Sequence, residues 1–194
     1  MHEAMTGDLL YPLDSFYAQI GLPPPGAVQV DGKDVPEPYR RLLVHERDMT
    51  PTLENEYGQG IHLCLLKSRI FDDVIEREVV LVLDQAQKPV EFGAIRIQLN
   101  DLHSRARQLV VEGNAPLGAI LRDQGIAHES HPKAYLRINS DNLIGSALGL
   151  TGSHVLYGRR NVLTYPFGNI LADIVEILPP SGDLAGLVRG SSKA

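Results

Sequence analysis

The sequence predicts an α+β domain built on an antiparallel sheet, and three observations support this fold class. The chain has 194 residues, which suits one domain with a substantial buried core. Its strand-like segments follow one another through connections too short for a crossover, so neighbouring strands should run antiparallel. Its helix-like segments gather in the middle of the chain rather than alternating with the strands.

The first part of the chain is expected to be an extension over residues 1–40. Residues 8–20 predict a short helix interrupted at Pro12. Residues 21–38 predict an irregular surface connector, because three consecutive prolines precede Gly26. The main domain is expected over residues 41–180, and residues 181–194 are expected to form a flexible tail.

Two short helices are expected at the start of the main domain. The stretch from Tyr39 to Glu46 has a helical pattern. Thr50 followed by Pro51 has the form of a helix start, with a hydroxyl N-cap and a proline in the first turn. The second helix should therefore run from Thr50 to Tyr57, with Gly58 ending it.

Six strands and three further helices are expected after these. The strands are predicted at residues 61–70, 74–84, 90–99, 134–139, 155–165 and 169–178. The helices are predicted at residues 101–112, from 115 to a stop at Gly125, and at 141–149. The second and third strands should form a hairpin, and the helical pair after it can pack over one sheet face and enclose a ligand.

Composition excludes several classes of function. The net charge of −6 argues against a nucleic-acid partner, because phosphate binding needs a basic field. Cys64 is the one cysteine, so neither an internal disulfide nor a cysteine-based zinc site is expected. The N-terminus lacks a signal sequence and no apolar run would span a bilayer, so we expect a cytoplasmic protein without membrane contact. We expect no metal site, and a monomer or a weak homodimer.

An arginine in an aliphatic strand face is the most informative feature of the chain. Side chains alternate faces along a strand, so Arg77 shares its face with Ile75, Val79, Leu81 and Leu83. Arginine keeps its proton, and a buried cation without a partner is strongly unfavourable. A negative group should therefore meet Arg77, either a carboxylate of the protein or an anionic ligand.

The strand from Ile170 to Leu178 presents the opposite charge. Glu176 shares the face of Ile170, whereas Asp173 points to the other face. Two interpretations stay open. Arg77 pairs with one of these acids inside the sheet or at a solvated strand end, or the sheet forms the floor of a pocket. In that pocket Arg77 would bind a ligand carboxylate, and Glu176 would bind a hydroxyl or a proton.

Three short segments add to this pattern and carry a resemblance. They are Leu42–Thr50, Ala115–Leu121 and Leu156–Leu163. With them the chain resembles the chorismate pyruvate-lyase family (chorismate lyase, 4-hydroxybenzoate synthase) from about Leu42 to Pro180. The order is a Leu-Leu helix before a Met-Thr turn, a hairpin with its arginine, Pro-Leu-Gly, Gly-Arg-Arg, and an acidic strand before proline.

The resemblance implies a fold and a reaction for residues 41–180. The fold would be a single domain with a six-stranded antiparallel sheet and helical lids over a buried, cofactor-free site. The reaction would eliminate pyruvate from chorismate, a small dianion, and leave 4-hydroxybenzoate. Arg77 and Glu176 would be the catalytic residues. The substrate-binding residues carried over by motif are Met49, Thr50, Arg77, Arg96, Leu117, Gly118 and Glu176.

Several alternatives stay open beside these roles. Met49 and Leu117 could be plain core residues, and the Arg159–Arg160 pair could hold a lid or pair with surface acids. The family often has Gly-Arg where this chain has Gly93 and Ala94, so Arg96, two residues on, would have to substitute. Asp173 competes with Glu176 for the role of the acid.

Two other functions compete with chorismate lyase activity. One is a non-catalytic sensor, because the fold resembles the small-molecule-binding domain of bacterial transcription regulators. Residues 1–40 are too proline-rich to supply a helix-turn-helix, which disfavours this function. The other is a lyase or isomerase that acts on a related enolpyruvyl or cyclohexadiene acid.

Overall fold

A seven-stranded antiparallel sheet with the strand order β1-β5-β6-β7-β4-β3-β2 organises the chain. The computed structural model describes residues 9–184. The strands are β1 (Ala27–Val30), β2 (Ile61–Phe71), β3 (Val74–Leu83), β4 (Pro89–Gln98), β5 (Glu129–Asn139), β6 (Val155–Thr164) and β7 (Ile170–Leu178). The β3–β4 hairpin expected from the sequence is confirmed.

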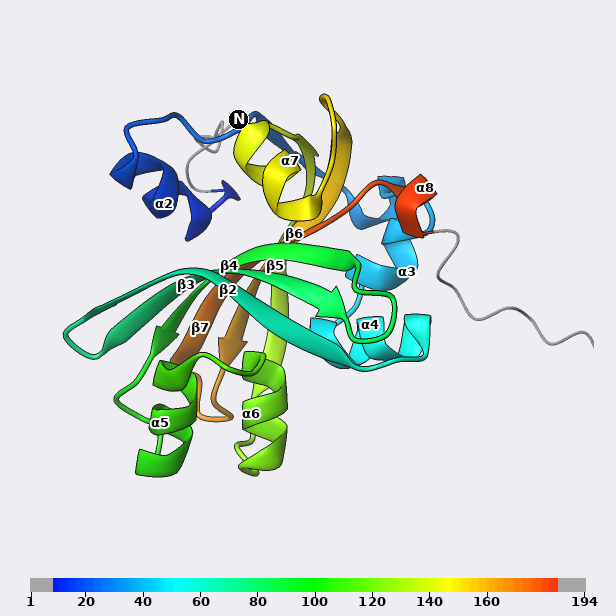
Figure 1. Ribbon diagram of the computed structural model, residues 1–194. Helices are drawn as coiled ribbons and strands as arrows, with labels where there is room; N and C mark the ends of the chain where they lie inside the picture. Colours follow the sequence, from blue (N-terminus) through cyan, green and yellow to red (C-terminus); the bar gives the residue numbers. More distant parts are fainter. Residues whose placement is uncertain (1–8, 185–194) are drawn as a thin grey trace, which may run out of the picture.

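Helices cover both faces of the sheet (Figure 1). They are α2 (Leu13–Gln19), α3 (Tyr39–Leu43), α4 (Met49–Tyr57), α5 (Ser104–Glu112), α6 (Leu117–Asp123), α7 (Asn142–Leu148) and α8 (Ser181–Leu184), with a 3-10 turn at Gly32–Asp34. The apolar faces of α2 and α7 pack on one side of the sheet. Those of α3, α4, α5 and α6 pack on the other side in two clusters. The α+β class is thus confirmed.

Two glycines end helices where the sequence predicts, whereas two helices start at other residues than predicted. Gly58 and Gly113 end α4 and α5 in the left-handed conformation, as predicted. The predicted Thr50 N-cap is wrong, because Thr50 lies inside α4 and Asp48 is the N-cap residue. Helix α5 begins later than expected, with His103 as its N-cap; the ring Nδ1 accepts a hydrogen bond from the Ala106 amide.

The expectation of six strands is corrected to seven by β1. This short strand lies in the segment predicted to be an irregular connector, and it pairs residue by residue with β5 at the sheet edge. Strand β5 also begins at Glu129 rather than at Ala134, because a register shift accommodates Pro132. In the predicted tail, residues 181–184 form α8. The predictions for residues 1–8 and 185–194 lie outside the described residues.

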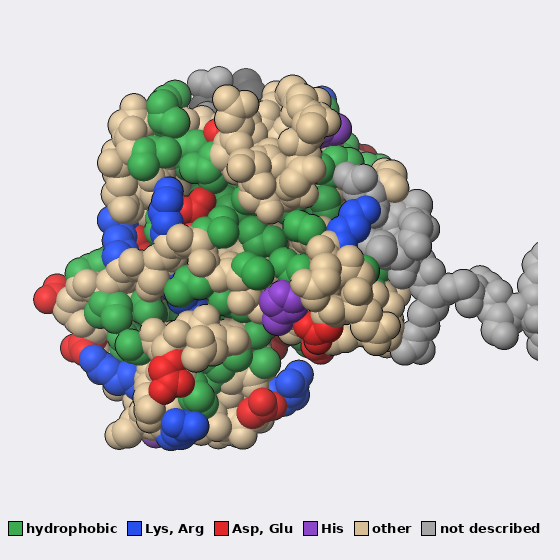
Figure 2. All heavy atoms as spheres, in the orientation of Figure 1, with side chains coloured by type: hydrophobic (Ala, Val, Ile, Leu, Met, Phe, Trp, Pro, Cys, Tyr) green, Lys and Arg blue, Asp and Glu red, His purple; other side chains and the backbone are tan. Residues whose placement is uncertain are grey.

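Strand β2 forms the other edge of the sheet and exposes apolar side chains. They are Leu65, Leu66, Ile70 and Phe71. Figure 2 shows hydrophobic side chains across the middle of the face in view, with charged side chains around them. None of the helices in the described part of the chain is long and apolar enough to cross a membrane.

Candidate functional site

A cavity of about 60 Å³ lies between the sheet and the helices α4 and α6. We call these two helices the lids, since they cover the same face of the sheet (Figure 1). The polar and glycine residues around the cavity are Asp48, Thr50, Arg77, Glu91, Gly93, Gly118, Asn161 and Glu176. A space of this size holds a few water molecules, so a ring-sized ligand needs the lids to part.

The sheet register places the two residues singled out by the sequence on one face. Arg77 on β3 lies opposite Ile95 on β4, and Glu176 on β7 lies opposite Gly93 on β4. Strand β4 therefore lies between the strands that carry the two charged residues. Because Gly93 has no side chain, the middle of the cavity floor is bare backbone.

Arg77 is buried without a carboxylate partner. Its residue is 1% exposed, and no ion pair joins it to an acid among the described residues. Its one hydrogen bond runs from Nη1 to the carbonyl oxygen of Val110 at 3.5 Å, a long distance, and its Nε has no partner. Burial lowers the pKa of Arg77 to about 10. Pairing inside the sheet thus does not explain this arginine.

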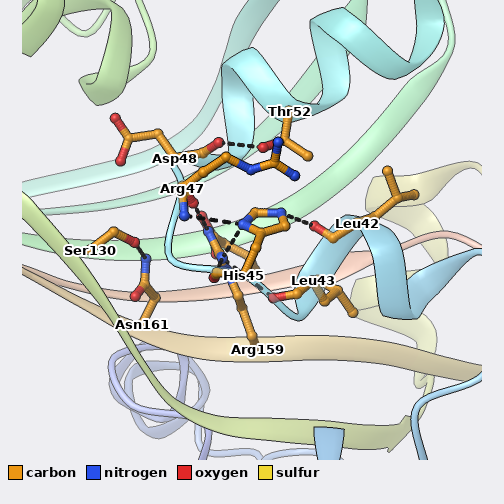
Figure 3. Close-up of polar contacts among 10 residues, drawn as sticks. Leu42, Leu43, His45, Arg47, Asp48, Thr52, Ser130, Arg159 and Asn161 are labelled. Carbon is orange, nitrogen blue, oxygen red and sulfur yellow. Dashed lines mark hydrogen bonds and ion pairs between the residues drawn. The ribbon is translucent and has the colours of Figure 1, made fainter. Parts of the chain in front are cut away.

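Glu176 has a different partner, Arg159 on the neighbouring strand β6. The Nε of Arg159 donates to the Glu176 carboxylate, and both side chains are buried. The terminal nitrogens of Arg159 donate to the carbonyl oxygens of His45 and Arg47, each at 2.9 Å (Figure 3). Arg159 therefore holds the loop before α4 against the sheet, one of the two roles left open from the sequence.

His45 completes this arrangement as a neutral ring. Its Nε2 lies 2.7 Å from the carbonyl oxygen of Leu42, so Nε2 carries the proton. Its Nδ1 then accepts from the Arg47 amide at 3.1 Å and from Arg159 Nη1 at 3.3 Å (Figure 3). Burial, together with the charge of Arg159, lowers the pKa of His45 to about 4.

Glu91 is a cavity residue that sequence reasoning missed. It is 5% exposed, and its Oε2 has no hydrogen-bond partner. Burial raises the pKa of Glu91 well above its ordinary range; the neighbouring Glu176 adds to the rise and Arg159 opposes it. The signal was present in the alternation of β4, where Glu91 shares a face with Gly93 and Ile95.

Asn161 is a second polar group that sequence reasoning missed. Its side-chain nitrogen donates to the Ser130 hydroxyl at 2.9 Å, while its oxygen has no partner (Figure 3). Buried polar atoms are nearly always hydrogen-bonded. Unpaired atoms of Arg77, Glu91 and Asn161 lie around this one cavity, which makes it the candidate ligand site among the described residues.

The lids contribute four more of the residues expected from the sequence. Met49 and Thr50 of α4 and Leu117 and Gly118 of α6 line the cavity. Asp48, the N-cap residue of α4, links this lid to the segment before β5, since its carboxylate lies 2.8 Å from Nε2 of His128. This contact raises the pKa of His128.

Arg96 and Asp173 do not face the cavity, which corrects two expectations. Arg96 lies opposite Glu76 and Asp173 in the sheet ladder, on the far side from Arg77. Its Nη1 donates to Glu76 at 2.8 Å, and its guanidinium lies 5.0 Å from the centre of the Phe71 ring. Arg96 cannot serve as the second cation of the site, and Asp173 cannot replace Glu176.

Comparison with known proteins supports the fold only. No family model matches the chain, and no curated protein matches it. PhnF from Mycobacterium smegmatis is similar, with a TM-score of 0.52 and 14% identity over 73% of this chain and 67% of PhnF. Its effector domain, solved separately, has a TM-score of 0.49 and 14% identity over 69% of this chain and 89% of the domain.

A third similar structure is the ligand-binding domain of a GntR-family transcriptional regulator from Bordetella bronchiseptica. Its TM-score is 0.46, with 10% identity over 61% of this chain and 85% of that domain. Of these three structures, PhnF has the TM-score above 0.5, and its likeness to this chain shows a shared fold. Sequence identities this low show a shared fold, and the function has to be argued from the residues of the site.

Proposed function

We propose that this protein binds a small organic anion in the cavity under α4 and α6, with Arg77 as the partner of the negative group. The observation that carries the proposal is the unpaired, buried guanidinium at the cavity wall. A guanidinium forms paired hydrogen bonds with a carboxylate, so an anionic ligand would offset the unfavourable burial of Arg77. The lids would exclude water from that pair.

Two features favour binding over turnover of chorismate. Chorismate carries two carboxylates, and among the described residues the cavity offers one cation that has no acid partner. Glu176 is the residue expected to act as a base, but Arg159 holds its carboxylate. The fold itself does not decide between a sensor and an enzyme.

A lyase that acts on chorismate or a related enolpyruvyl acid is the second candidate. The observation that favours it is that Arg77 and Glu176 line the same cavity. In that mechanism Glu176 would orient the ring hydroxyl or remove the ring hydrogen, and Arg77 would stabilise charge on a carboxylate or on the leaving oxygen. Met49 and Leu117 would hold the ring between the lids.

Incubation with chorismate separates the two candidates. Chromatography would detect pyruvate and 4-hydroxybenzoate, and calorimetry with 4-hydroxybenzoate would measure binding without turnover. The binding proposal expects heat of binding in the wild-type protein, no heat in Arg77→Met, and no products. Equal amounts of pyruvate and 4-hydroxybenzoate, lost in Glu176→Gln, would establish the lyase instead.

A further inference from the structure

We infer that Glu91 carries a proton in the folded protein and sets the ligand class of the cavity: monoanions with an uncharged polar group at the far end. This inference rests on the proposed binding function and adds the charge and shape of the ligand. Glu91 would donate its proton to that polar group while Arg77 binds the anionic end.

The position of Glu91 carries the first step. On β4, Glu91 lies opposite Leu81 of β3, and Gly93 lies opposite Val79 of β3. Arg77 is four residues before Leu81, so the backbone positions of Arg77 and Glu91 stand ~13 Å apart along the sheet. Both residues line the cavity, with Gly93 between them. Along β3 and β4 the cavity therefore has Arg77 at one end and Glu91 at the other, with Glu176 of β7 beside Gly93 between them.

The charges around Glu91 carry the second step. Glu176 on β7 and Arg159 on β6 act on it directly, and they form an ion pair with each other. On the lid side, Asp48 is in contact with His128, and His45 is a neutral ring that faces Arg159. The pair of Glu176 and Arg159 has no net charge, so Glu91 gains no full positive partner that would favour ionisation.

The net charge of the closed cavity carries the third step. With Glu91 protonated, Glu176 paired with Arg159 and Asp48 paired with His128, Arg77 leaves one positive charge. A monoanion cancels that charge, whereas a dianion buries one uncompensated negative charge beside two acids. A protonated carboxyl also supplies a donor and an acceptor, which match an amide, a hydroxyl or a carbonyl group.

A matched pair of ligands tests this selectivity. 4-Carbamoylbenzoate and terephthalate have the same shape, but the first is a monoanion and the second a dianion at neutral pH. Calorimetry at pH 6.5 should give at least tenfold tighter binding of 4-carbamoylbenzoate to the wild-type protein. Equal or tighter binding of terephthalate would overturn the inference.

The pH dependence tests the proton on Glu91 itself. Affinity of the wild-type protein for 4-carbamoylbenzoate should fall between pH 6.5 and pH 8.5, a range below the pKa of about 10 of Arg77, as Glu91 ionises and cancels the charge of Arg77. Glu91→Gln keeps the shape without the titration, so its affinity should stay level over the same range. Glu112→Gln, a change at an exposed acid on α5, is the control and should follow the wild type. A decline of equal size in Glu91→Gln would contradict the inference.

A measurement without ligand keeps the two proposals apart. Carbon-13 resonance of the glutamate side chains, with the Glu91 signal assigned by its loss in Glu91→Gln, reports the protonation state directly. A Glu91 carboxyl that is still protonated at pH 6.5 supports the inference even where neither benzoate binds, an outcome that would count against the binding proposal. A Glu91 carboxylate that is ionised at pH 6.5 overturns the inference whether or not a ligand binds.

Discussion

Arg159 on β6 donates from Nε to Glu176 on β7, while its terminal nitrogens hold the carbonyl oxygens of the loop before α4. One buried guanidinium thereby joins the floor of the cavity to a lid. Glu176 thus pairs with Arg159 and not with Arg77, which has no acid partner among the residues that the structure describes.

Removal of the Arg159 side-chain charge should destabilise the fold strongly. Arg159→Met leaves Glu176 buried and without its cation, so the free energy of unfolding should fall by ~3–5 kcal/mol. Urea denaturation measures this change. Arg122→Met removes an exposed ion pair with Asp123 and should alter the free energy by less than about 0.5 kcal/mol. Equal small effects in both variants would contradict the role given to Arg159.

Removal of the Arg77 charge, unlike that of Arg159, should not destabilise the fold. Arg77→Met removes a buried cation without a carboxylate partner and keeps most of the side-chain volume, so the free energy of unfolding should stay unchanged or rise by on the order of 1–3 kcal/mol. Thermal unfolding without ligand measures this. A clear loss of stability would show that Arg77 supports the fold, and would remove the reason for assigning it to a ligand.

His45 should make the protein sensitive to acid. Its folded pKa of about 4 lies below the ordinary value of 6.5, so the unfolded chain takes up a proton first as the pH falls. The stability from His45 is complete above pH 6.5 and is lost as the pH falls towards 4. The loss should be on the order of 1–2 kcal/mol, allowing for partial exposure of the ring.

His45→Gln checks the pH effect, because glutamine does not titrate. Urea denaturation at pH 7 and pH 5 should show a smaller drop in stability for the variant than for the wild type. An identical drop in both proteins would assign the acid sensitivity to other groups.

Gly158 should tolerate no side chain. A Cβ there would overlap the carbonyl oxygen of Glu176 and lie 3.3 Å from the Cα of Ile177, both part of the β7 backbone. Gly158→Ala must push β6 and β7 apart and should destabilise the fold by ~1–3 kcal/mol. Gly182→Ala, with nothing within 4 Å of its added Cβ, is the control. Equal melting temperatures would show that the two strands separate without strain.

Much of the fold follows from local patterns in the sequence. The alternation in β3 and β4, the hairpin between them and the glycines that end α4 and α5 are local signals, and the structure contains them. Strand β1 is different, since it has four residues and its stability comes from pairing with β5, more than a hundred residues away. No local sequence pattern predicts that pairing.

In the candidate site, too, some features follow from local sequence patterns and others depend on which strands pair. Alternation along two separate strands selected Arg77 and Glu176, and both residues line the cavity. Arg96 was misassigned because its face depends on the register between β3 and β4, where an irregularity near Leu81 shifts the pairing. The pairing of Arg159 with Glu176 depends likewise on which strands are neighbours, so the sequence alone left it open.

A nuclear magnetic resonance titration with 4-carbamoylbenzoate tests the central claim most directly. In the wild-type protein the backbone amide signals of Gly93 and Gly118, on the floor and the lid of the cavity, should shift with the ligand and saturate. In Arg77→Met, folded as the wild type, the same signals should stay in place. Equal shifts in both proteins, or shifts confined to residues far from the cavity, would contradict the account.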